Sequence, residues 1–213
     1  MSNKIQNKGK LITVEGIEGV GKTSNVNFIA KYIRDAGKQV IVTREPGGTP
    51  VAEAIRGIIL ADFDEQMFGE TELLLLYAGR LQHVENVIKP ALNKGQWVVC
   101  DRFTDATYAY QGAGRGVPIP KIDELYRWTL GNFEPDWTIL LDAPVDLAFE
   151  RILKLRDLDR IEREKKSFFE KIRMQYLAMS VRHPERYRVV DASRPLVEVQ
   201  NEITSIMAKI IQQ

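Results

Sequence analysis

Residues 16–23, GIEGVGKT, combine glycines, a lysine and a threonine in the spacing G-x-x-x-x-G-K-T. Glycines at such positions let consecutive backbone N–H groups point into one loop, and the N-terminus of a following helix adds partial positive charge. This spacing therefore predicts a loop that holds the phosphates of a nucleoside triphosphate. Its residues are Gly16, Ile17, Glu18, Gly19, Val20, Gly21, Lys22 and Thr23.

Two side chains at the end of this loop have expected roles. Lys22 is expected to reach the β- and γ-phosphates of the nucleotide, and the Thr23 hydroxyl is expected to bind Mg²⁺. Glu18 does not fit so simply, because a carboxylate in the middle of the loop repels phosphates. What Glu18 faces is therefore a question that the loop alone does not answer.

Arginines recur near the places where the expected strands end. They are Arg44, Arg56, Arg80, Arg102 and Arg115. In an open α/β sheet, ligands bind beyond the carboxyl ends of the strands. Any one of these arginines fits an ordinary surface salt bridge, but a cluster of guanidinium groups suits an anionic substrate. The set predicts a second phosphate-bearing ligand opposite the glycine-rich loop.

Five short runs rich in β-branched residues supply strands that can position these groups. The runs are residues 10–16, 39–45, 96–102, 136–144 and 187–193. They show little polar alternation, which is typical of strands buried on both faces of a parallel sheet. Helical patterns lie between and after them, at residues 26–37, 71–93, 145–155, 167–181 and 195–211. We expect one α/β domain, residues 1–213, with a five-stranded parallel sheet between layers of helices.

The composition limits the partners and the cellular location that we expect for the protein. Thirty basic and 29 acidic residues leave a formal charge of +1, which gives no sign of a nucleic-acid-binding face. Cys100 is the single cysteine, so a disulfide within the chain is excluded and a buried thiol is favoured. His83 and His183 lack partners at metal-ligand spacing and are expected to be structural or surface residues. With no apolar signal segment or membrane-length run, we expect a cytoplasmic protein without nucleic-acid or membrane partners.

Five motifs in order extend the prediction from a loop to a family. GIEGVGKT, TREPGGT, DRF, YQGAGRG and LDRIE together resemble bacterial thymidylate kinases, and the similarity runs from about Lys10 to the last helix. The resemblance implies a P-loop NTPase fold, a homodimer, and transfer of the γ-phosphoryl group of ATP-Mg²⁺ to dTMP. The alternatives are another deoxynucleoside or nucleotide kinase, or a P-loop regulatory ATPase.

The resemblance also implies roles for individual residues toward dTMP. Its phosphate would be held by Arg102 together with Arg44 or Arg56. The thymine edge would be read by Arg80, Thr107 and Gln111, and Tyr110 would crowd the sugar 2′ position. Glu18 would accept a hydrogen bond from the 3′-hydroxyl, which answers the question of what it faces. Asp101 would bind Mg²⁺ with Thr23, and residues 192–194 would pass the adenine.

Two features depart from the family pattern. Many relatives stack thymine on an aromatic residue four positions before the arginine matched by Arg80, and here Leu76 stands there with Tyr77 beside it. Other members carry an arginine in the P-loop where this chain has Gly19, so the catalytic arginine is expected from a lid at about residues 154–165. The basic residues in and next to this lid are Arg151, Lys154, Arg156, Arg160 and Arg163. Arg160 is our first choice for catalysis and Arg156 the second, beside Lys22, Glu18 and Arg102.

Overall fold

The computed structural model describes residues 8–154 and 160–212. Within these ranges the strands are Leu11–Glu15 (β1), Val40–Arg44 (β2), Trp97–Asp101 (β3), Trp137–Asp142 (β4) and Tyr187–Asp191 (β5). All neighbouring pairs are parallel, in the order β2-β3-β1-β4-β5. Each predicted run forms a strand, so the predicted five-stranded parallel sheet is confirmed.

The strand order places β1 between two later strands. The chain leaves β1 toward β2 on one side of the sheet and later crosses to β4 on the other side. At such a switch point the connecting loops diverge and leave a crevice beyond the carboxyl ends of the strands. The loops that follow β1 and β3 meet at this crevice, and both contain candidate site residues.

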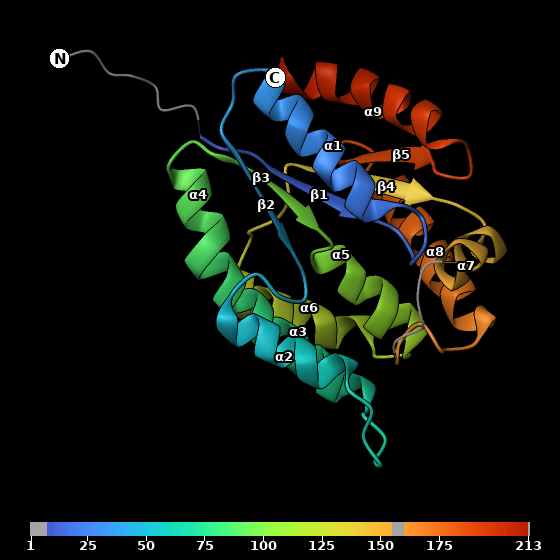
Figure 1. Ribbon diagram of the computed structural model, residues 1–213. Coiled ribbons are helices and arrows are strands. Elements are labelled where there is room, and N and C mark those ends of the chain that lie inside the picture. The colour runs from blue at the N-terminus through green and yellow to red at the C-terminus, as the bar shows by residue number, and fades with distance from the viewer. Residues whose placement is uncertain (1–7, 155–159, 213) are drawn as a thin grey trace.

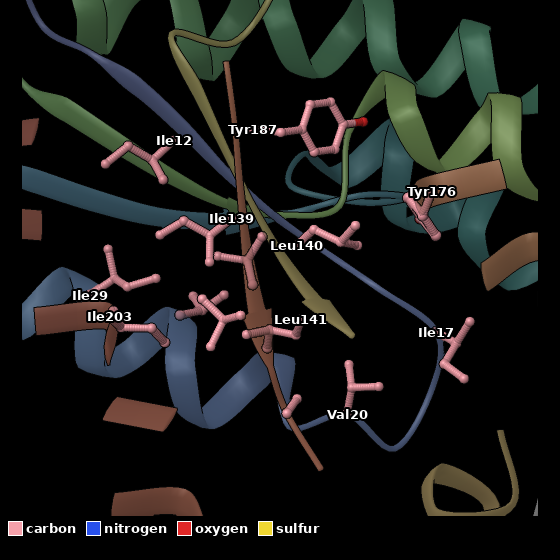
Figure 2. Packing of buried hydrophobic residues seen from close by; sticks show 14 of the residues in the cluster. Ile12, Ile17, Val20, Ile29, Ile139, Leu140, Leu141, Tyr176, Tyr187 and Ile203 are labelled. Atoms are coloured by element: carbon pink, nitrogen blue, oxygen red, sulfur yellow. The ribbon is translucent and has the colours of Figure 1, made fainter. Parts of the chain in front are cut away.

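One face of the sheet is covered by α1 (Lys22–Asp35) and α9 (Leu196–Ile211), which lie side by side (Figure 1). Alternate residues of a strand point to opposite faces, and Figure 2 shows Ile139 and Leu141 turned toward Ile29 of α1 and Ile203 of α9. All four side chains are buried. Their burial fixes α1, and hence the loop before it, against the centre of the sheet.

The other face carries α3 (Gly69–His83), a π-helical turn (η1, Val84–Ile88), α4 (Lys89–Asn93) and α6 (Ile119–Leu130) (Figure 1). The predicted helix over residues 71–93 is thus interrupted and restarted, with Pro90 in the first turn of α4. A proline at that position is tolerated because its missing N–H would have no partner within the helix. The prediction that Pro90 kinks or restarts the helix is confirmed.

The remaining helices frame the carboxyl edge of the sheet. They are α2 (Pro50–Leu60), α5 (Thr104–Thr107) with its π-helical continuation η2 (Tyr108–Gly114), α7 (Val145–Leu153) and α8 (Lys166–Arg182). Helices α2 and α6 were not predicted, although both have start signals. Thr49 caps α2 by accepting from Ala52 N (3.2 Å), and α6 follows Pro118 and ends before Gly131. None of the described helices is long and apolar enough to cross a membrane.

Candidate active site

The loop between β1 and α1 has the backbone that its glycines predict. Gly16, Gly19 and Gly21 all have positive φ, at 137°, 74° and 87°. At Gly19 a Cβ would also collide with the carbonyl oxygen of Ala148 in α7. A side chain at position 19 is therefore excluded by both conformation and space. The loop as folded here therefore has no room for an arginine at this position.

Lys22 closes the loop by folding back over it. Its Nζ donates to the carbonyl oxygens of Ile17 (2.7 Å) and Gly16 (3.2 Å). Burial, followed by the charge of Arg102, lowers the pKa of Lys22 to about 8, although Asp101, Glu18 and Glu15 act in the opposite direction. A phosphate in the loop would add negative charge and would favour the charged form of this ammonium group further.

Arg102, the residue after β3, joins the two loops. Its φ of 67° is unusual for a residue other than glycine, and such strain is concentrated at functional sites. Its Nη1 donates to Gly16 O (2.9 Å) and its Nη2 to Glu18 Oε1 (2.7 Å) and Tyr110 Oη (2.9 Å). Tyr110 in turn donates to Glu18 Oε2 (2.6 Å). The carboxylate that seemed misplaced in the loop is therefore paired with a guanidinium group.

The charge balance at Glu18 follows from these contacts. Burial alone would raise the pKa of this carboxyl group. Arg102, Lys22 and the Tyr110 hydroxyl outweigh burial and lower it. Glu18 is thus an anion at neutral pH and accepts hydrogen bonds only.

The larger of the two cavities at this edge has a volume of about 750 Å³. It is lined by the loop from Glu18 to Thr23, by Asp101, and by basic side chains of α7 and of the segment after β5. These are Arg151, Lys154 and Arg194. Ala192 and Arg194, which the family resemblance implies lie beside the adenine, line this cavity, and the cavity size suits a nucleoside triphosphate.

The smaller cavity, of about 100 Å³, lies on the other side of Glu18 and Arg102. Its wall has an apolar part, with Leu76, Phe103 and Ile161, and a polar part, with Arg80, Thr107 and Gln111. Glu18, Glu45, Arg56 and Arg102 line both cavities. Two cavities therefore meet at the carboxylate of Glu18 and the guanidinium of Arg102.

A buried network holds the polar part of the smaller cavity. Arg80, 3% exposed, donates from Nε to Glu45 Oε2 (2.6 Å) and from Nη1 to Thr107 Oγ1 (3.0 Å). His83 bonds the other oxygen of Glu45 through Nδ1 (3.1 Å) and Thr43 through Nε2 (2.6 Å). The structure confirms that His83 is structural: it orients the carboxylate that orients Arg80. The sequence shows no spacing that would have revealed this pairing.

Four residues proposed to bind the monophosphate have different environments. Leu76 lines the smaller cavity, whereas Tyr77 is 1% exposed and belongs to the hydrophobic core. Arg56 lines both cavities and donates to Pro46 O (2.9 Å). Arg44 is exposed, lines the larger cavity and pairs with Glu53 (2.9 Å). These positions favour Leu76 over Tyr77 beside a base, and Arg56 over Arg44 beside a phosphate.

The predicted lid lies partly outside the described residues, and Arg156 is among those left out. Arg160 lies against α2 and α3, with Nε donating to Ile59 O (2.9 Å) and Nη2 to Glu72 Oε1 (2.8 Å). Its neighbour Ile161 lines the smaller cavity, and Glu162, 2% exposed, lines the larger one. Arg151, one of the basic residues noted near the lid, bonds Ala192 O (2.8 Å) beside the larger cavity. Arg160 is therefore on the side of the smaller cavity, and its predicted catalytic role stays a prediction.

The oxygen atoms near the loop suit a magnesium ion. Asp101 and Thr23 line the same cavity as Lys22, and a carboxylate with a hydroxyl is a hard-oxygen donor pair. Mg²⁺ takes few protein ligands and completes its shell with water and substrate phosphates. Among residues 8–154 and 160–212, no cluster of three or more His, Cys, Asp or Glu side chains forms a metal cage. The donor set thus fits an ion that arrives with a nucleotide.

A phosphate loop on β1 and α1, joined through Glu18 and Arg102 to a second and smaller site, defines a P-loop kinase that acts on a small phosphorylated substrate. The sequence specifies the family further, since the family model described as thymidylate kinase matches residues 14–203. This chain belongs to the thymidylate kinase family. It is an enzyme that phosphorylates dTMP to dTDP with ATP as the other substrate.

Individual relatives agree with this assignment. The chain is 50% identical over 202 residues to a thymidylate kinase of Alcanivorax borkumensis, with 95% of this chain and 97% of that one covered. It is 51% identical over 197 residues to a thymidylate kinase of Methylococcus capsulatus, with 92% and 94% covered. The crystal structure of thymidylate kinase from Ehrlichia chaffeensis matches with a TM-score of 0.75 at 29% identity, over 94% of this chain and 99% of that one.

Proposed function

We propose that the larger cavity binds ATP with Mg²⁺ and that the smaller cavity binds dTMP. The observation that carries this assignment is the wall shared by the two cavities, made of Glu18, Glu45, Arg56 and Arg102. A phosphoryl group that is transferred from a nucleotide in one cavity to a nucleotide in the other passes beside these shared residues. The cation at its centre, Arg102, stabilises negative charge as the group moves.

In this assignment the chain's residues position the reactants and balance their charge. Lys22 leaves the carbonyl oxygens of Gly16 and Ile17 and binds the β- and γ-phosphates. Arg102 and Arg56 hold the phosphate of dTMP, whose anionic oxygen attacks the γ-phosphorus. No strong general base is needed, because the attacking oxygen already carries negative charge.

Magnesium would be held by Thr23 and Asp101. When bound, it neutralises charge on the β- and γ-phosphate oxygens. Glu18 takes no part in holding it in this proposal: Arg102 and Tyr110 donate to its two oxygens, and a carboxylate with one donor on each oxygen can still accept a further hydrogen bond.

In this proposal Glu18 and Tyr110 recognise the sugar of dTMP. Their side chains line the smaller cavity and are bonded to each other (2.6 Å), so their positions are fixed before a ligand arrives. Glu18 accepts from the 3′-hydroxyl, and the ring of Tyr110 occupies space beside the 2′ position. A preorganised pair of this kind costs little entropy on binding.

Two further proposals concern the whole protein. Exposed apolar side chains on α2, α3 and the segment between them support a homodimer: Val51, Ile58, Phe63, Phe68 and Leu74 are 44–65% exposed. We also infer a cytoplasmic location, where dTMP and ATP are available.

A panel assay tests the proposed substrates directly. The enzyme is incubated with ATP-Mg²⁺ and dTMP, dUMP, dCMP, AMP or thymidine, and ADP is followed. We expect the highest kcat/KM with dTMP. A preference for AMP or for the unphosphorylated nucleoside would contradict the assignment of the smaller cavity, and ADP formation without any acceptor would favour the ATPase alternative.

A further inference from the structure

A buried carboxylate lies beside the smaller cavity without lining it. Glu72, in the first turn of α3, is 1% exposed. Three side chains from other parts of the chain donate to it. They are Gln111 (Nε2 to Oε2, 3.0 Å), Arg115 (Nε to Oε2, 3.3 Å) and Arg160 (Nη2 to Oε1, 2.8 Å). Of these, Gln111 lines the smaller cavity.

The contact to Gln111 determines which way its amide faces. A carboxylate accepts hydrogen bonds and donates none, so the NH₂ end of Gln111 must be the end that faces Glu72. The amide oxygen lies on the other arm of the planar group. Reversing the amide would place two oxygen atoms against each other in a buried site, which is costly.

We propose that Glu72 is a positioning residue for base recognition: by holding Nε2 of Gln111, it turns the amide oxygen toward the smaller cavity as an acceptor for the N3–H of a pyrimidine. The inference rests on the assignment of this cavity to dTMP. Glu72 acts through Gln111 and does not touch the ligand.

The chemical consequence is selection between pyrimidines. Thymine and uracil present an N3–H donor and an O4 acceptor, which match the oxygen of Gln111 and the guanidinium of Arg80. Cytosine presents an N3 acceptor and a 4-amino donor, so both contacts become repulsive. A site with a fixed amide therefore rejects dCMP without any steric difference between the bases.

Two arginines offset the energetic cost of burying the carboxylate of Glu72. Arg115 and Arg160 both pair with Glu72, at 3.2 and 2.8 Å. A carboxylate offers these donors acceptor oxygens only, whereas a glutamine in its place offers both a donor and an acceptor. Glu72→Gln should therefore leave Gln111 free to adopt either orientation while changing little in shape.

The test is a comparison of bases in Glu72→Gln, Gln111→Ala and the double variant. Steady-state kcat/KM is measured with ATP-Mg²⁺ and dTMP, dUMP or dCMP. In Glu72→Gln we expect the ratio of dTMP to dCMP to fall by about tenfold or more, since a donor then faces N3–H for part of the time. The ratio of dTMP to dUMP should stay unchanged, because both bases carry N3–H.

The ratio between bases separates positioning from general damage. Glu72→Gln also weakens the ion pair to Arg160, so turnover is expected to fall with every substrate, and this loss cancels in the ratio. Gln111→Ala should lower the same ratio, and in the double variant Glu72→Gln should lower it no further. Glu70→Gln is the matched control, since Glu70 lies on the same turn but is exposed and pairs with Lys121 (3.2 Å).

Three outcomes would overturn the inference. A wild-type ratio in Glu72→Gln would show that the amide is oriented without Glu72. An equal fall of the ratio in the Gln111→Ala background would show that Glu72 does not act through Gln111. An unchanged ratio and KM in Gln111→Ala itself would remove the cavity assignment as well. If Glu72→Gln does not fold by circular dichroism, Glu72→Asp, which shortens the acceptor by one methylene, is held to the same criteria.

Discussion

At the residue scale, Lys22 is the side chain on which the phosphate loop depends most directly. Lys22→Ala removes the charge that reaches the β- and γ-phosphates, and we expect phosphoryl transfer to fall by ~10³-fold or more. ADP formation with dTMP as acceptor measures the loss. Lys31→Ala is the matched control, because Lys31 lies on the same helix, is exposed, and pairs with Asp35. Wild-type turnover in Lys22→Ala would contradict the assignment of the loop.

Glu15, the last residue of β1, gives a second prediction at this scale. It is fully buried and accepts from Phe103 N (2.7 Å) and Tyr176 Oη (2.7 Å), and Tyr176 also bonds Arg102 (3.2 Å). Burial, followed by the charge of Asp105, raises the pKa of Glu15 to about 8. Between about pH 4.5 and 8 the folded state therefore binds a proton that the unfolded state has lost. Stability from this group is present below that window and falls as pH rises through it.

The isosteric variant Glu15→Gln removes this titration. We expect the free energy of unfolding of the wild-type protein to fall relative to that of the variant by up to roughly 1.4 kcal/mol per pH unit across this window. Urea unfolding at pH 5, 6.5 and 8 measures the difference. Parallel pH profiles for the two proteins would contradict a raised pKa at Glu15.

At the scale of elements, the segment between α7 and α8 is predicted to complete the site. Arg160→Ala is expected to lower kcat by roughly 10²–10³-fold with little change in the fold. Because Arg160 bonds Ile59 O and Glu72 beside the smaller cavity, KM for dTMP must be measured separately from kcat. A rise in KM alone would make Arg160 an anchor of this segment. Arg151→Ala, measured in parallel, tests the basic side chain that lines the larger cavity.

The strands could be predicted because each is marked by a run of apolar, β-branched residues that are consecutive in the sequence. In β3 the first four residues, 97–100, are apolar and buried, as burial on both faces of the sheet requires. Helices α2 and α6 were missed because each has a proline in its first turn, Pro50 or Pro120, within a segment rich in glycine and proline, which suggests a loop. Their caps are local signals too, and closer attention to Thr49-Pro50 would have found α2.

The site was predictable only in part, for a related reason. The phosphate loop lies in consecutive residues, so its spacing alone indicates its chemistry. Pairs such as Glu45 with Arg80 and Glu72 with Gln111 join residues 35 and 39 positions apart. Which side chain pairs with which over such a sequence separation depends on how the helices pack over the sheet. The spacing of residues in the sequence does not reveal that packing.

At the scale of the whole molecule, the fold concentrates its strain and charge at one edge of the sheet. Arg102 with positive φ, half-buried Glu18 and the carbonyl-bound Lys22 all lie beyond the carboxyl ends of β1 and β3. The two hydrophobic clusters on the faces of the sheet hold these loops in place. Rigid support of this kind is what allows a polar site to be preorganised before either nucleotide binds.

The exposed apolar face of α2 and α3 gives the last prediction. Leu74 of α3 is 57% exposed, and Ile58 of the adjacent α2 is 44% exposed. A stable homodimer buries ~1,200–2,000 Å² in total, and a charge at the centre of such an interface opposes association. We expect the wild-type protein to sediment as a dimer and Leu74→Arg as a monomer at the same concentration. Val197→Arg, on α9 at the opposite face of the sheet (Figure 1), is 69% exposed in the wild type and should leave the dimer intact. A monomeric wild-type protein, or a dimer that survives Leu74→Arg and dissociates in Val197→Arg, would place the interface elsewhere or remove it.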